Sequence, residues 1–166
     1  MTAATPDRSM ARRRRQASAG SLGSVLAAVG GGLVLYSTFA PRDWWWLAPV
    51  AFLAIGFAWR GRGARRGAVS GMLAGLAFFV PLLSWIGEFV GPMPWLVLAT
   101  FQALFLAATG GAVGALPDQW WWPLAGAAVW TAGEAARSRI PFGGFPWGRV
   151  GFGQAEGIFT PVATLA

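Results

Sequence analysis

Three long runs without a single charged residue constrain this chain more than any other feature of its sequence. They cover residues 22–40, 68–87 and 95–116. Each is about 20 residues long, and an α-helix of that length crosses the hydrocarbon core of a bilayer. Because lipid offers no hydrogen bonds to the backbone, chains that enter it form helices or closed barrels. The runs therefore predict an all-α membrane protein.

Two shorter apolar runs complete the pattern, at 44–59 and 120–136, and a further one begins at 158–166. Only 11% of the residues are charged, against about a quarter in soluble domains. We therefore predict a polytopic helical bundle with five full transmembrane helices and the start of a sixth. Residues 1–20 are polar and basic and are predicted to be a disordered cytoplasmic tail, which leaves 21–166 as the transmembrane domain.

The distribution of arginines predicts the orientation. If the N-terminus is cytoplasmic, the inner side holds Arg8, Arg12 to Arg15, Arg60, Arg62, Arg65 and Arg66, and the outer side holds Arg42, Arg137, Arg139 and Arg149. Cytoplasmic loops carry the excess of basic residues, so this orientation is favoured over its inverse. It also explains the net charge of +7 without nucleic acid. The protein is thus predicted to be a multi-pass membrane protein with the loops 87–94 and 137–157 on the outer face.

The side chains that usually carry catalysis are missing from the sequence. There is no cysteine and no histidine, and all 13 basic residues are arginine. This excludes thiolate and histidine catalysis and the common metal-ligand sets within this chain. The acidic residues are scattered and predict no carboxylate pair. We predict no catalytic residue, no metal and no cofactor.

Trp130, Glu134 and Arg137 follow one another at helical spacing on a single helix face. A carboxylate next to a membrane segment needs a partner or water. One interpretation is an ion pair between Glu134 and Arg137 that closes the helix end. The other is a polar anchor that orients the loop that follows. In the run 95–116, Gln102 is the one strongly polar side chain.

The segment Ile140–Gly157, "IPFGGFPWGRVGFGQAEG", combines glycines, prolines and aromatic residues and cannot form a regular span. It is predicted either to be re-entrant or to lie against the outer mouth of the bundle, where Arg149 is placed to attract a lipid phosphate. Trp85 and Glu88 lie at the outer end of the run 68–87. They are either an interfacial tryptophan and a solvated acid, or the lining of an outer cavity.

These residues resemble the apolipoprotein N-acyltransferase family. The resemblance rests on Trp130, Glu134 and Arg137 followed by "GGFPWGRVGFGQ", with support from "YSTFAPRDWWWLAPVAFLAI" and "LLSWIGEFVGPMP", and covers about residues 20 to 166. It implies an enzyme that moves an acyl chain from a phospholipid to the N-terminal diacylglyceryl-cysteine of a lipoprotein. The implied partners are therefore the phospholipid donor, the lipoprotein and membrane lipids. The implied location is the bacterial inner (cytoplasmic) membrane.

The resemblance also implies a nitrilase-like domain with a Glu-Lys-Cys triad, and the sequence departs from the family there. It has neither cysteine nor lysine, and Phe152 stands where the family commonly has tyrosine. The chain is therefore expected to be the N-terminal membrane part of such an enzyme, a fragment inactive alone. The residues predicted to shape a portal for lipid substrates are Trp85, Glu88, Trp130, Glu134, Arg137, Phe145, Pro146, Trp147, Arg149 and Gln154.

Two other functions remain open from the residues. The absence of catalytic side chains is typical of a non-enzymatic membrane scaffold or tether subunit. Half of a small transporter is the second alternative, although no predicted span carries an ionisable residue at mid-depth.

Overall fold

The chain folds into a bundle of α-helices in a computed structural model that describes residues 8–155, 157, 158 and 160, with side chains from Ser21 onward. No β-strand occurs within these residues, so the predicted all-α class is confirmed. Two short 3₁₀ helices accompany six α-helices. In chain order, the elements are α1 (Arg8–Ser37), η1 (Trp45–Leu47), α2 (Ala48–Trp59), α3 (Ala64–Leu82), α4 (Ser84–Val90), α5 (Pro92–Ala115), α6 (Trp122–Arg137) and η2 (Phe152–Gln154).

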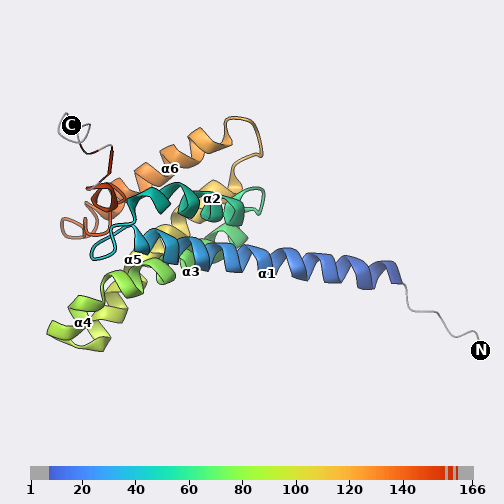
Figure 1. Cartoon of the computed structure of the whole chain (residues 1–166). Helices are drawn as coiled ribbons and strands as arrows, with labels where there is room; N and C mark the ends of the chain where they lie inside the picture. Colours follow the sequence, from blue (N-terminus) through green and yellow to red (C-terminus); the bar gives the residue numbers. More distant parts are fainter. Residues whose placement is uncertain (1–7, 156, 159, 161–166) are drawn as a thin grey trace, which may run out of the picture.

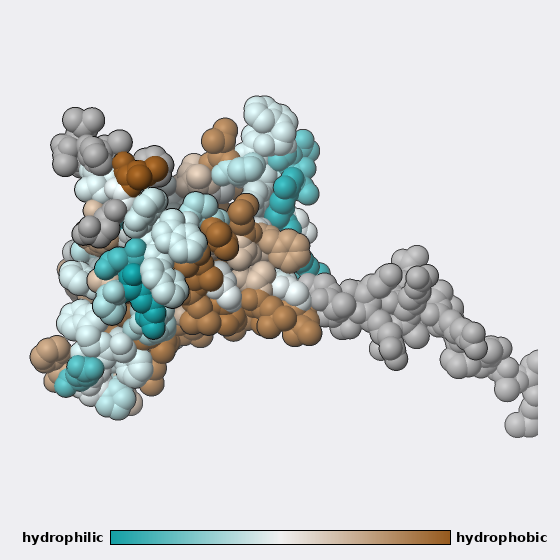
Figure 2. Space-filling view, in the orientation of Figure 1, coloured by the Kyte–Doolittle hydropathy of each residue, from teal (hydrophilic) through white to brown (hydrophobic). Residues whose placement is uncertain are grey.

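The connections between helices gather at two ends of the bundle (Figure 1). At the end from which α1 projects, which we call the arginine end, Arg60 in the α2–α3 connection pairs with Asp118 in the α5–α6 connection. At the opposite end, the loop end, lie α4, the turn 38–47 and the segment 138–155. On the face drawn in Figure 2, hydrophobic residues cover the middle of the body and hydrophilic residues gather toward its ends.

Glycines hold the central helices unusually close together. A Cβ added at Gly71 of α3 would meet the backbone of Leu106 in α5, and one added at Gly75 would meet Ala103. Gly110 and Gly114 of α5 face Gly67 and the Gly63 carbonyl in the same way. Small residues four positions apart in each helix therefore let α3 pack closely against α5.

The third predicted run, 68–87, is not one straight helix. The helix breaks at Leu83, and α3 and α4 are bent by 56° relative to each other. Pro81 lies just before the break and has no amide hydrogen to donate within the helix. Residues that were predicted to complete this span and to start the loop 87–94 instead form α4.

The first helix begins at Arg8 rather than near residue 22, so it extends through most of the segment predicted to be a disordered tail. Residues 8–18 contain neither glycine nor proline and consist mainly of arginine, alanine and other helix-forming residues. The start of a sixth helix, predicted at 158–166, falls almost entirely outside the described residues.

Within the described residues, α5 is the one helix that is by itself long and apolar enough to cross a membrane. The bent pair α3 and α4 meets the same criterion only when both are counted as one span. The segments Ser21–Ser37 and Trp45–Trp59 are apolar helices of shorter length. The predicted count of five transmembrane helices is therefore not established by helix length and composition.

Candidate functional site

Arg137, the last residue of α6, is the most deeply buried charged side chain in the described part of the protein, with 2% of its surface exposed. Its Nη1 donates hydrogen bonds to the carbonyl oxygens of Phe145 (3.0 Å) and Trp147 (2.6 Å). The same nitrogen donates to Gln102 Oε1 at 3.3 Å. Its guanidinium also lies over the ring of Phe79, 5.1 Å from the ring centroid. One buried cation thus joins α5, α3 and the loop after α6.

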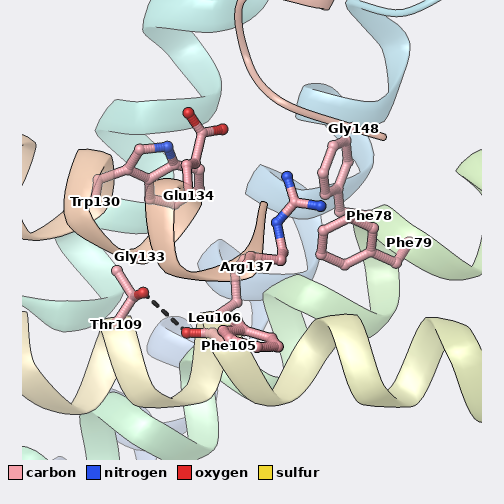
Figure 3. Close-up of a pocket in the computed structure, with 10 residues that line it drawn as sticks. All are labelled: Phe78, Phe79, Phe105, Leu106, Thr109, Trp130, Gly133, Glu134, Arg137 and Gly148. Carbon is pink, nitrogen blue, oxygen red and sulfur yellow. Dashed lines mark hydrogen bonds between the residues drawn. The ribbon is translucent and has the colours of Figure 1, made fainter. Parts of the chain in front are cut away.

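Glu134 holds the same loop at a second point. Its Oε1 accepts a hydrogen bond from the backbone N–H of Val150 at 2.8 Å. The two charged side chains of α6 point in different directions (Figure 3), and they form no ion pair among the described residues. The interpretation of Glu134 and Arg137 as an ion pair is therefore wrong. Loop carbonyls and a loop amide satisfy the two charges separately, so the geometry agrees with a polar anchor.

Further contacts complete what we call the loop clamp, which is defined by Gln102, Glu134, Arg137 and Gln154. Gln154 Nε2 donates to the carbonyl of Trp45, more than a hundred residues earlier in the chain, at 3.2 Å. Gly148 has a φ of 76°, and a Cβ there would collide with Leu82 and Phe79. Only glycine allows the loop to approach α3 this closely. The clamp therefore fixes the loop along most of its length.

The clamped loop displays aromatic side chains on the surface. Trp147 lies 6.1 Å from Trp85 of α4 and 6.2 Å from Phe152, between ring centroids. Phe89 continues the series at 6.3 Å from Trp85. We call Phe89, Trp85, Trp147 and Phe152 the aromatic row, and all four are exposed. Residues from α4 and from the loop thus form one apolar surface at the loop end.

The cavity beneath the loop is too small for a substrate (Figure 3). Its volume is about 10 Å³, which is room for about one water molecule. Its walls include Phe78, Thr109, Trp130, Glu134 and Arg137. Glu134 and Arg137 are hydrogen-bonded to the loop, so their side chains hold the loop backbone in place. The cavity beside them leaves no room for a reaction.

The structure separates the ten predicted site residues into groups. Glu134, Arg137 and Gln154 belong to the loop clamp, with Phe145 half-buried beside them. Trp85 and Trp147 form the centre of the aromatic row. Trp130 is buried and packs against Phe52 and Trp59.

The other three predicted residues are exposed. Pro146 and Arg149 lie on the outside of the loop. Glu88 lies on α4 and has no hydrogen bond or ion pair within the described part of the chain. Its position agrees with a solvated acid.

Three important residues were not among the predicted site residues. Gln102 gave a signal as the one strongly polar side chain of the run 95–116, but that signal did not identify Arg137 as its partner. Phe79 and Gly148 gave no comparable signal, because their role depends on the distance between α3 and the loop.

The arrangement can bind and orient, but it offers no nucleophile or general base. Its charged groups are held by backbone partners, and its exposed surface is aromatic. Such a surface suits contact with acyl chains, since aromatic rings gather at membrane interfaces.

Comparison with known proteins identifies the family of the chain. Residues 31–166 match the sequence model of the apolipoprotein N-acyltransferase N-terminal domain. The chain is 43% identical over 103 residues to an apolipoprotein N-acyltransferase of Mycolicibacterium smegmatis, covering 59% of this chain and 17% of that protein. It is 31% identical over 159 residues to one of Photobacterium profundum, covering 88% of this chain and 30% of that protein. The chain thus spans less than a third of the length of these two relatives.

Proposed function

Because the chain belongs to the apolipoprotein N-acyltransferase family, through the N-terminal domain at residues 31–166, we propose that it forms the membrane domain of such an enzyme. The whole enzyme would transfer an acyl chain from a phospholipid to the N-terminal diacylglyceryl-cysteine of a lipoprotein. The observation that carries the role of this part is the loop clamp. Buried Arg137 fixes a loop whose exposed face is aromatic.

In this proposal the aromatic row contacts the acyl chains of lipid substrates as they approach the catalytic centre. Phe142 supports the same role, since it is fully exposed at the loop tip with a left-handed φ of 53°. A bulky residue rarely adopts that conformation, and such strain is concentrated at functional sites. Contact of these rings with lipid acyl chains would remove their exposed apolar surface from water, which is energetically favourable.

We further propose that the chain crosses the bacterial inner membrane with five helices and a cytoplasmic N-terminus, with the loop end outside. The arginine end holds Arg60, Arg62, Arg65 and Arg66, as expected of a cytoplasmic face. Leucines and phenylalanines remain exposed along the sides of the bundle, among them Leu26, Leu53 and Phe57. In a bilayer these side chains would face lipid.

Residues 1–166 alone are proposed not to transfer acyl groups. The support is that the family resemblance implies a thioester on a cysteine, and this sequence contains no cysteine. A purified chain that acylated a diacylglyceryl peptide in the presence of phospholipid would contradict this proposal.

A chimera tests the role of the loop end. Residues 31–166 would replace the matching segment of the Mycolicibacterium smegmatis relative, and N-acylation of a diacylglyceryl-cysteine peptide would be measured. We expect the chimera to be active and the double variant Trp147→Ala/Phe152→Ala to lose most of that activity. Trp120→Ala is the matched control, because Trp120 is an exposed tryptophan of the α5–α6 connection, at the arginine end. Equal activities of the two variants would contradict the proposed lipid contact, and an inactive chimera would favour a scaffold.

The orientation is tested by labelling single cysteines in this cysteine-free chain. Arg149→Cys and Gln119→Cys are suitable positions, because both side chains are exposed. A membrane-impermeant maleimide added to intact spheroplasts should label Arg149→Cys and spare Gln119→Cys. Labelling of both from the same side would overturn the proposed topology.

A further inference from the structure

A second, larger cavity lies at the arginine end, far from the loop clamp. It has a volume of about 300 Å³ and opens between α1 and α3. Three of its eight lining residues are arginines: Arg62 from the α2–α3 connection, and Arg65 and Arg66 from the first turn of α3. The remaining lining residues are Ser21, Ser24, Val25, Val69 and Ser70.

Two of these arginines, Arg65 and Arg66, have no acidic partner among the described residues. Both are exposed and have no hydrogen bond or ion pair with the residues that the structure describes. The acidic residue described at this end is Asp118, and its carboxylate is paired with Arg60 at 2.6 Å. Arg62 lies over the ring of Phe57, 5.7 Å from the centroid. An anion at Arg65 and Arg66 would therefore meet two guanidinium groups with no competing carboxylate among the described residues.

The position of two of these arginines is unfavourable for the helix itself. They lie in the first turn of α3, which contains no acidic residue. The N-terminus of a helix carries a partial positive charge and is destabilised by cations nearby. An anion bound in the cavity would remove this repulsion and would also be attracted by the helix end. The arrangement thus gains stability when an anion is present.

The walls of the cavity distinguish a lipid from a free anion. Val25 and Val69 are among its lining residues, and Val69 is exposed one turn after Arg65. Leu22 and Leu26 extend the apolar surface along α1, and both are exposed. The hydroxyl groups of Ser24 and Ser70 donate to backbone carbonyls, which leaves Arg65, Arg66 and the Ser21 hydroxyl as donors for a ligand. A phosphate with apolar chains attached matches this combination of cations and apolar surface.

We propose that this cavity binds the phosphate headgroup of an anionic glycerophospholipid from the cytoplasmic leaflet, with the acyl chains lying along Val69 and α1. Arg65 and Arg66 are the principal ligands of the phosphate. Basic pockets between helices on the cytoplasmic side of membrane proteins bind such headgroups. This site would hold a structural lipid at the membrane face opposite the aromatic row, and it does not depend on the acyl-transfer proposal.

The test uses the full chain purified in a neutral maltoside detergent. Native mass spectrometry measures the binding of phosphatidylglycerol, with phosphatidylcholine as the zwitterionic comparison and inorganic phosphate as the free anion. The variant is Arg65→Gln/Arg66→Gln. The matched control, Arg42→Gln/Arg139→Gln, also removes two positive charges, but from exposed positions at the loop end.

We expect the chain to prefer phosphatidylglycerol to phosphatidylcholine. The Arg65→Gln/Arg66→Gln variant should bind phosphatidylglycerol about 30-fold more weakly. This ratio follows from the binding free energy that each of two arginines usually contributes near an anionic lipid surface. The control variant should bind it as the wild type does. Equal losses in both variants, or no preference between the two lipids, would overturn the proposal. Displacement of the lipid by millimolar inorganic phosphate would show a free-anion site and would overturn the assignment to a lipid.

A second measurement separates ligand binding from a general effect on folding. In lipid-free micelles the thermal midpoint of Arg65→Gln/Arg66→Gln should equal or exceed that of the wild type, because two cations leave the N-terminus of α3. On addition of phosphatidylglycerol the wild type should gain more than the variant. A variant that melts lower in lipid-free micelles but gains as much as the wild type from the lipid would refute the site.

Discussion

Replacing Arg137 by methionine should release the loop at residues 138–157 while leaving the helices in place. Methionine has a similar length and keeps the apolar contact with Phe79, but it cannot donate a hydrogen bond. The carbonyls of Phe145 and Trp147 and the side chain of Gln102 would each lose their bond to Arg137. The variant thus removes the main polar link between α6, α5 and the loop.

The expected magnitude follows from these three acceptors. Each buried acceptor that loses its donor destabilises a protein by about 1–3 kcal/mol. Phe145 and Trp147 lie close to the surface and can recover water, so the lower end of this range applies to them. We therefore expect the loop to open more easily by about 3 kcal/mol in total. This corresponds to an increase of about 100-fold in the exchange rate of loop amides that exchange by local opening.

Hydrogen–deuterium exchange of the detergent-solubilised chain measures this effect. The informative amides are those of Phe145, which donates to the Arg137 carbonyl, and Val150, which donates to Glu134. Amides of α5 should change much less, which distinguishes loop opening from global unfolding. Arg139→Met is the control, because the Arg139 side chain is exposed and, among the described residues, donates only to the carbonyl of Ala135 in α6. Unchanged exchange at Phe145 and Val150 in Arg137→Met would refute the reasoning.

Three further predictions address the anchor, the helix packing and the surface. Glu134→Ala should raise the hydrogen-exchange rate of the Val150 amide about tenfold. Glu134→Gln retains a carbonyl oxygen as acceptor for this amide and should raise the rate less. Equal effects of the two variants would argue against this hydrogen bond. In a thermal unfolding assay, Gly71→Leu should lower the free energy of unfolding by about 3 kcal/mol, because the new side chain meets the α5 backbone. Gly30→Leu is the control. Its side chain enters open space and should leave the free energy of unfolding nearly unchanged. Asp118→Asn removes an ion pair whose side chains are half exposed and should change the unfolding free energy by less than about 1 kcal/mol; a larger loss would mean that this pair is shielded from solvent.

The loop clamp shows how far local spacing can be interpreted. Helical periodicity placed Trp130, Glu134 and Arg137 on one face and predicted that the polar pair either closes the helix or anchors the loop. The choice between these alternatives depended on where residues 145–150 lie, which periodicity does not determine. In the folded chain their carbonyls reach Arg137 and the Val150 amide reaches Glu134, so both charges are satisfied without an ion pair.

By itself, the sequence determined the helical class and the family. These follow from apolar run length and from a specific motif, both of which are local properties of the chain. Tertiary structure alone decided the break at Leu83, the meeting of α4 with the loop in the aromatic row, and the partners of Arg137. These depend on contacts between residues distant in sequence, and the energy of such a contact is set by the distance and burial that only the folded chain defines.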